Sequence, residues 1–341
     1  MIGFVLAILA QVGLLVLGAL WGGGWAVAAL VYITAFAAAL DRVVPRLFPD
    51  AAQGAEFPSG ARFSVALGLI HFALLGLVLH VISGDALSVA EKLFIFVAYA
   101  LFFGQVSHPN AHELIHRSAR FPRLLGRWVY ISLLFGHHAS AHVLVHHSYV
   151  GTEKDPNSPK LGASFYHFFA KAWRGSFTQG LKAETALRAR GSRARRRWSH
   201  PYVQYVGGAV GFVVAAAVLF GAKGLIAYLT LALYAQVQIL LADYVQHYGL
   251  RRVIRDNGKP EPVSDAHSWN SPHWFSSALM VNAPRHSDHH LHPSRPYPGL
   301  RLRDGMPILP HSLPVMAVLA LYPPIWRRVM RRELDGLGKG G

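Results

Sequence analysis

Histidine is the residue whose number and spacing in this chain point most directly to chemistry. The sequence holds 20 histidines and no cysteine, so metal or redox chemistry within it must use nitrogen and oxygen ligands. The lack of cysteine excludes disulfides, iron–sulfur clusters and cysteine-ligated zinc. Most of the histidines lie between Val106 and Pro293, where they form groups with regular spacing.

Four short groups carry this pattern. They are the segments His112–His116, His142–His147, Asp243–Leu250 (which contains His247) and His286–His290. On a helix, residues four apart share one face, so His112 and His116 should project together. A single pair of this kind is a weak signal, but four groups in one region are a strong one.

The second and fourth groups extend the argument to two ions. His142 and His146 should share a helical ridge, with His147 about 100° further round and able to reach a second metal. In the fourth group, three histidines fall within one arc of about 100° and should converge as a triad. The members of that triad are His286, His289 and His290.

The four groups predict a metal site for two ions, because nine imidazoles exceed the needs of one. Imidazole binds iron, copper, zinc and nickel, so spacing alone leaves the metal open. The predicted ligands are His112, His116, His142, His146, His147, His247, His286, His289 and His290. Nearby carboxylates are candidates to accept a hydrogen bond from the second ring nitrogen and to balance charge. These carboxylates are Glu113, Glu153, Asp155, Asp243 and Asp288.

The elements that position these groups are predicted to be membrane helices. The chain is 52% hydrophobic and 15% charged, whereas a soluble domain carries about a quarter charged residues. Its apolar residues form blocks long enough to cross a bilayer core of roughly 30 Å. We therefore predict an all-α integral membrane protein, a single domain over residues 1–341 with six transmembrane helices. The predicted spans are residues 3–21, 25–41, 62–83, 90–107, 203–221 and 224–246.

Charge predicts the orientation of these spans. The net charge is +16, and the basic residues concentrate outside the three short turns that join the spans in pairs. The positive-inside rule then places both termini and a helical cap carrying the histidines on the cytoplasmic side of a bacterial-type inner membrane. Two shorter apolar stretches, Leu124–Phe135 and Leu313–Trp326, are predicted to be interfacial or re-entrant helices. No nucleic-acid-binding module accompanies the basic charge, so nucleic acid is not an expected partner.

The histidine groups resemble those of a known family, the integral-membrane alkane 1-monooxygenases, which are related to xylene monooxygenase and to membrane fatty-acid desaturases. The resemblance covers roughly residues 105–297. His112–His116 resembles the family's His-Glu-Leu-x-His box, His142–His147 its His-x-x-x-His-His box, and Arg285–His290 its Arg-His-Ser-x-His-His box. Asp243–Gly249 resembles its Asn-Tyr-x-Glu-His-Tyr-Gly motif.

The resemblance implies two non-haem irons held by histidines, O₂ as oxidant and terminal hydroxylation of medium- or long-chain n-alkanes. It also implies a separate rubredoxin-type electron donor with its reductase, and an alkane-like substrate that enters from membrane lipid. The sequence departs from the family's pattern at four positions around the ligands. These are Ala141 and Gln246, where the family has Glu, Asp243 where it has Asn, and Arg117 where it commonly has Lys.

Three alternatives stay open. The first is a related membrane di-iron oxidase, such as a xylene-type methyl hydroxylase, a fatty-acid hydroxylase or a desaturase. The second is an intramembrane zinc metalloprotease, because His112–His116 also fits His-Glu-x-x-His with Glu113 as base. The third is a metal transporter, which is disfavoured because transporters place ligands at mid-membrane depth and these histidines lie at or beyond the ends of the predicted spans.

Overall fold

The chain folds into helices joined by loops. The computed structural model describes residues 1–44, 57–190 and 197–338, so the middle of the arginine-rich stretch before residue 197 lies outside the described residues. Within these ranges the only strand-like pairings are isolated bridges, Ile254 with Pro260 and Asn270 with Ile308. The all-α prediction is therefore confirmed for the described part of the chain.

The first four predicted spans correspond to four long helical segments. α1 (Ile2–Trp21) is followed by α2 (Gly23–Val31), η1 (Tyr32–Phe36) and α3 (Ala37–Val43), which form one rod. α4 (Pro58–Ser83) is followed by a second composite rod. That rod consists of α5 (Val89–Phe102), η2 (Phe103–Ser107) and α6 (His108–Ile115). Helix therefore continues past the predicted end of the fourth span and carries His112 with it.

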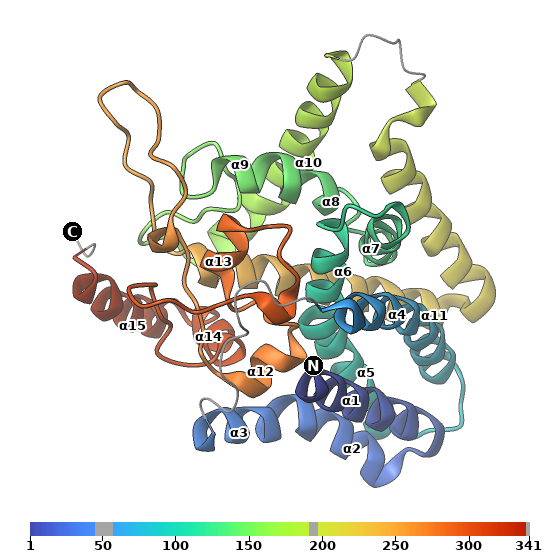
Figure 1. Cartoon of the computed structure of the whole chain (residues 1–341). Coiled ribbons are helices and arrows are strands. Elements are labelled where there is room, and N and C mark those ends of the chain that lie inside the picture. Colours follow the sequence, from blue (N-terminus) through green and yellow to red (C-terminus); the bar gives the residue numbers. More distant parts are fainter. Residues whose placement is uncertain (45–56, 191–196, 339–341) are drawn as a thin grey trace.

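The fifth and sixth predicted spans lie in one element, α11 (Pro201–His247), which has 47 residues. Gly221 interrupts its helical geometry with φ 64°, a conformation that glycine adopts without the steric cost of a side chain. Figure 1 shows the chain changing direction at this bend, at the right-hand end of α11. Among the described residues, five helices are long and apolar enough to cross a membrane, whereas the sequence predicts six, because no loop separates the two halves of α11.

The three turns between paired spans lie at one end of the molecule. The Gly23 N–H of the first turn donates to Glu91 at the start of α5 (2.7 Å). Asp85, in the α4–α5 turn, pairs with Lys223 just after the α11 bend (3.1 Å). Contacts between residues so far apart in sequence bring all three turns together, as expected for three adjacent hairpins.

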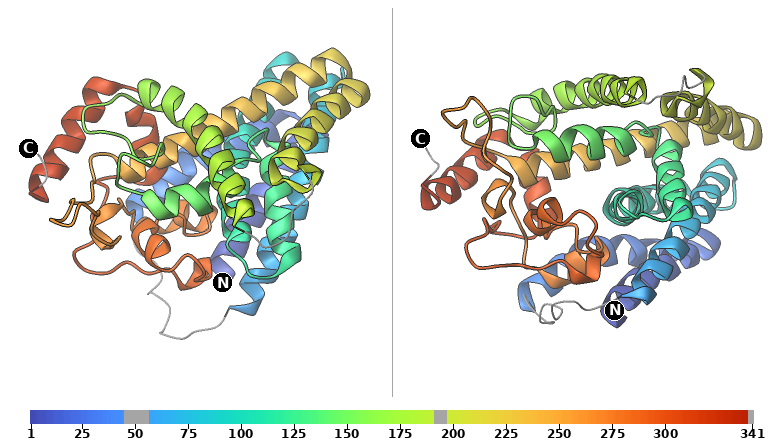
Figure 2. Two further views of the ribbon diagram at one scale, coloured as in Figure 1. Left: turned by 90° about the horizontal axis from the view of Figure 1, so that it is seen from above. Right: turned by 45° about the horizontal axis from the view of Figure 1, so that its top comes forward.

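The remaining helices cover the other end of these spans. The short amphipathic helix α7 (Arg120–Ser132) packs across α4 and α11. Both views in Figure 2 place α15 at the opposite end of the molecule from the α11 bend. The other elements are α8 (His138–Ala141), η3 (His142–His146), α9 (His147–Tyr149), α10 (Phe165–Ala189), α12 (Trp274–Leu279), α13 (His286–Leu291), α14 (Leu313–Ala320) and α15 (Pro323–Gly336), with short 3₁₀ turns at Arg197–Ser199, Asp265–His267 and Tyr297–Gly299.

Asp41 ties the first hairpin to this covering layer. Its buried carboxylate accepts hydrogen bonds from the backbone N–H groups of Phe275 (3.0 Å) and Ser276 (3.1 Å), in the first turn of α12. The two donors would otherwise be unpaired at a helix start. Replacing Asp41 with alanine should therefore destabilise the fold by about 1–3 kcal/mol. Thermal unfolding in detergent tests this, and Asp41→Asn, which keeps one acceptor oxygen, should lose less; equal losses would rule out the capping role.

Candidate metal centre

All nine predicted histidines meet in two adjacent clusters. The ring nitrogens within each cluster lie within 4.8 Å of one another. The five-histidine cluster consists of His112, His116, His142, His147 and His289. The four-histidine cluster consists of His146, His247, His286 and His290. Each cluster draws side chains from at least three helical segments, so the tertiary fold and not one motif assembles it.

The five-histidine cluster is built around close contacts between Nε2 atoms. Nε2 of His142 lies 2.7 Å from Nε2 of His112 and 2.9 Å from Nε2 of His147. Nε2 of His147 is also 3.1 Å from Nε2 of His289. The fifth member, His116, turns a buried Nε2 atom toward this group with no hydrogen-bond partner in the described structure.

The four-histidine cluster has a similar core. Nε2 of His286 lies 3.0 Å from Nε2 of His247 and 3.1 Å from Nε2 of His290. The ring of His146 is 4.7 Å from that of His247, and its buried Nε2 has no partner among the described residues. All four side chains are buried.

A π-helical turn decides how the histidines of the segment His142–His147 divide between the two clusters. His142–His146 is η3, in which hydrogen bonds run from residue i to i+5. His142 and His147, five apart, therefore face the same cluster, and His146 faces the other. The predicted ridge of His142 with His146 is wrong, because it assumed α-helical spacing.

The predicted triad in the fourth group is also wrong. His286 and His290 are one α-helical turn apart on α13 and share the four-histidine cluster, whereas His289 joins the five-histidine cluster. Consecutive residues point about 100° apart on a helix, so His289 and His290 can serve two sites that flank α13.

The electrostatics of the clusters suit metal ligands. Burial, together with neighbouring histidines, lowers the pKa of His142, His147 and His289 well below the usual value, and burial lowers that of His116 to about 3. Such rings are neutral at pH 7, which is the form that binds a metal. A neutral imidazole has one N–H, so several converging nitrogens cannot all be satisfied by bonds among themselves. A cation held by each cluster would accept their lone pairs, so the residues present fit a metal ion.

Asp155 is the carboxylate that contacts a cluster histidine directly. Its Oδ2 lies 2.8 Å from Nδ1 of His146 and accepts a 2.6 Å hydrogen bond from the Ser158 hydroxyl. Its Oδ1 accepts from the backbone N–H of Asn157 (3.0 Å). Burial opposes ionisation, but His146 and these donors more than offset it and hold the pKa of Asp155 below its usual value. Asp155 in turn raises the pKa of His146 despite its burial.

The other four predicted carboxylates have different partners. The prediction that Glu153 is a partner of the site is wrong, because the loop turns this residue toward solvent. Its side chain is 81% exposed and pairs with Lys160 at 2.7 Å. Asp243 accepts a 2.6 Å hydrogen bond from the Asn157 amide. Glu113 pairs with Arg117 (3.0 Å), and Asp288 pairs with Arg295 and Arg303.

The position of Glu113 bears on the protease alternative. A His-Glu-x-x-His protease needs this carboxylate beside the metal as a base. Here it faces Arg117 and accepts a 3.4 Å hydrogen bond from the backbone N–H of Tyr297. The geometry therefore does not support that role.

A small cavity joins the two clusters. Its volume is about 20 Å³, room for roughly one water-sized molecule. Histidines of both clusters line it, and apolar side chains form much of the remaining wall. The lining residues are His108, Pro109, His112, His138, His142, Ala242, Asp243, Gln246, Met280, Ala283, His286 and Leu313.

Two further histidines line this cavity that are not among the nine predicted ligands. His108 Nδ1 lies 3.0 Å from the buried Tyr130 hydroxyl, and the ring of His138 is 5.2 Å from that of His142. Both histidines lie outside the ligand spacings, although each stands four residues before a predicted ligand. That i, i+4 relation to His112 and to His142 was the available signal.

Helices of membrane-spanning length that bring together one buried and one partly buried histidine cluster define a multi-pass membrane protein with a site suited to two metal ions. The chain belongs to the fatty acid desaturase family, whose model matches residues 87–316. It is 28% identical to alkane 1-monooxygenase 2 of Alcanivorax borkumensis over 277 residues, 81% of this chain and 72% of that protein.

Two further relatives point to the same group. Alkane 1-monooxygenase 2 of Pseudomonas aeruginosa is 32% identical over 227 residues, 67% of this chain and 60% of that protein, so the chain spans about three fifths of this relative. The xylene/toluene monooxygenase hydroxylase component XylM of Pseudomonas putida is 27% identical over 302 residues, 84% of this chain and 76% of that protein.

Proposed function

We propose that this chain is a non-haem di-iron monooxygenase that hydroxylates a terminal C–H bond of medium- or long-chain n-alkanes. The observation that carries the proposal is the pair of adjacent histidine clusters around one small cavity, at the ends of apolar helices. The similarity to alkane 1-monooxygenases supports the substrate class. The nine histidines would hold two irons, five ligands at one and four at the other.

The irons would supply the reductive activation of O₂ that attack on an unactivated C–H bond requires. The chain's own residues do the rest. The histidines would hold the ions as neutral imidazoles. Asp155 fixes the orientation of the His146 ring. Apolar residues such as Met280 and Leu313 face the cavity beside the histidines, where they exclude water and accept the terminal methyl group of the substrate. The net reaction consumes O₂, two electrons and two protons, and yields a primary alcohol and water.

The electrons must come from another protein if no redox group other than the irons is present. We propose a rubredoxin-type donor with its reductase, docking on the basic face of the protein. Product analysis with reductant, this donor, ¹⁸O₂ and a panel of n-alkanes should give primary alcohols carrying one ¹⁸O atom, and the rate should fall as salt rises. Metal quantification should give iron.

The same assay separates the alternatives. Hydroxylation of methyl-arenes in preference to alkanes would favour the xylene-type reaction, for which the similarity to XylM is a specific argument. An alkene product would favour a desaturase. One zinc per chain and peptide cleavage would favour the protease. Any of these outcomes would overturn the alkane proposal.

We also propose six membrane crossings in one domain, with both termini and the histidine site on the cytoplasmic side of an inner membrane. α11 is about 70 Å long at 1.5 Å per residue, more than twice the bilayer core, and the Gly221 bend lets its halves cross separately. Because the chain has no cysteine, single-cysteine variants test this cleanly. A cysteine at Lys223 should react with an impermeant reagent from outside, and one at Arg174 only after lysis; labelling of both from the same side would contradict the topology.

A further inference from the structure

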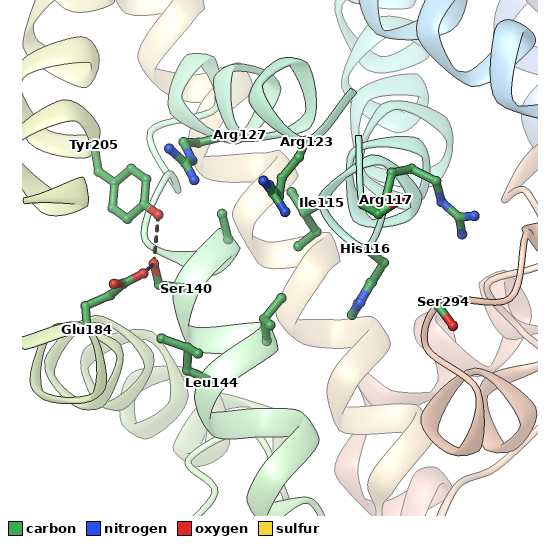
Figure 3. A pocket seen from close by; sticks show the side chains of 13 residues that line it. Ile115, His116, Arg117, Arg123, Arg127, Ser140, Leu144, Glu184, Tyr205 and Ser294 are labelled. Carbon is green, nitrogen blue, oxygen red and sulfur yellow. Dashed lines mark hydrogen bonds between the residues drawn. The ribbon is translucent and has the colours of Figure 1, made fainter. Parts of the chain in front are cut away.

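A second and larger cleft lies on the outer side of the five-histidine cluster. Its volume is about 430 Å³, and it is bounded by α7, α8, η3, α10 and the start of α11 (Figure 3). Ile115 and His116 form part of its inner wall, and the proposed function assigns the cleft no role.

Two arginines of α7 dominate the charge in this cleft. Arg123 and Arg127 are one helical turn apart, and both point into it (Figure 3). Arg127 donates to Gln204 Oε1 (3.2 Å), and its buried Nε has no partner in the described structure. Arg123 forms no ion pair within the residues that the structure describes. Two guanidinium groups with donors to spare are suited to a phosphate or carboxylate.

The polar side chains of the far wall already have hydrogen-bond partners. The Ser140 hydroxyl donates to Glu184 Oε1 (2.6 Å) and lies 2.7 Å from the Tyr205 hydroxyl. A third lining arginine, Arg117, pairs with Glu113 outside the cleft. Arg123 and Arg127 therefore share the cleft with one carboxylate, Glu184, which leaves an excess of positive charge.

The mouth of the cleft adjoins a lipid-facing surface. Val206, Val210 and Val214 on the first half of α11 are 50%, 56% and 53% exposed, a stripe at helical spacing. Trp128, on α7 beside Arg127, packs on Phe212 of the same half with ring centres 6.3 Å apart. Arginines at the point where an apolar span begins lie at the depth of phospholipid phosphates.

We propose that this cleft binds the headgroup phosphate of a membrane phospholipid, with Arg123 and Arg127 holding the phosphate and the acyl chains lying along the α7–α11 apolar surface. A bound headgroup covers the side of His116 that faces the cleft. It therefore slows the exchange of metal and water between the five-histidine cluster and solution. This inference does not depend on which reaction the metal site performs.

The test compares metal-loaded protein in nanodiscs of phosphatidylglycerol, nanodiscs of an uncharged glycolipid with the same acyl chains, and the glycolipid nanodiscs with added inorganic phosphate. Lipid retention is measured by native mass spectrometry, and metal loss by the rate of extraction into a chelator. Phospholipid should bind and slow extraction; inorganic phosphate should not. Arg123→Gln should weaken retention about fivefold, and Arg123→Gln with Arg127→Gln about 25-fold.

Arg120→Gln is the matched control, because Arg120 is an exposed arginine of the same helix that does not line the cleft. It should retain lipid like the wild type. Arg123→Gln alone keeps the test valid if the double variant fails to fold, since the Arg123 side chain is exposed and loses no ion pair with any residue that the structure describes. Wild-type lipid retention in the Arg123 variant, or equal protection by inorganic phosphate, would overturn the lipid site.

Discussion

His290→Ala is expected to remove one of two metal ions per chain, whereas His289→Ala, one residue away, should retain more metal. His290 belongs to the four-histidine cluster, where its Nε2 lies 3.1 Å from that of His286. Its loss leaves three imidazoles, one fewer than the four protein ligands that complete a tetrahedral site without help from solvent. His289 belongs to the five-histidine cluster, and its loss leaves four. Both variants should lose more than about 100-fold in turnover, because a lost ligand costs more than a lost partner of a ligand.

Metal per chain, measured by plasma mass spectrometry beside alkane turnover, checks this expectation. His167→Ala is the control, because His167 is an exposed histidine on α10 outside both clusters. It should keep full metal and activity. Two ions and wild-type turnover in the His290 variant would remove the four-histidine cluster from the metal centre. Equal metal loss in both variants would argue against two separate sites.

The sequence identified the nine clustered histidines but not their division into two clusters. All nine histidines were identifiable because each group combined close spacing with a position at or beyond the end of an apolar block. Their assignment to clusters failed in two places: at His142–His146 the local geometry departs from an ideal α-helix, and on the α-helix α13 neighbouring histidines reach two different clusters. Nothing in the residues His142–His146 distinguishes a π turn from an α turn, and that turn decides which cluster His146 joins.

Prediction of the fold from the sequence was limited in a similar way. Hydropathy located every long apolar helix, because lipid-facing residues must be apolar over a fixed length, but it gave no sign of the polar helix α10. It could not distinguish two helices from one bent helix at Gly221, since a glycine in either case follows an apolar block. Long-range contacts such as that of Asp41 with the start of α12 link residues more than two hundred positions apart, and no local sequence pattern encodes them.

The partner carboxylates were the least predictable part of the site. Glu153 and Asp155 are two residues apart in one loop, and proximity in sequence favoured both equally. The fold buries Asp155 completely and leaves Glu153 largely exposed. Gln246, one of the departures from the family's pattern, donates to the Ala283 carbonyl (3.1 Å) and lines the small cavity. A glutamate there would need another partner, so this substitution changes the charge of the cavity wall and leaves the ligands intact.

Asp155→Asn is expected to weaken metal binding in the four-histidine cluster about 10- to 100-fold, with a similar fall in turnover. The carboxylate accepts from the His146 ring, the Ser158 hydroxyl and the Asn157 backbone. An amide of the same shape offers one oxygen for three donors, and its NH₂ group opposes a ring N–H. His146 then loses the contact that fixes its orientation and tautomer, while the five-histidine cluster keeps all its ligands.

Glu153→Gln is the matched control, since it makes the same chemical change two residues away on an exposed side chain. It should leave metal content and turnover unchanged. Metal titration with a competing chelator should show one weakened site in the Asp155 variant and one unaltered site, which a general loss of folding would not produce. Wild-type affinity at both sites would mean that the buried His146–Asp155 pair only packs the loop, and that the orientation of His146 is set by its helix alone.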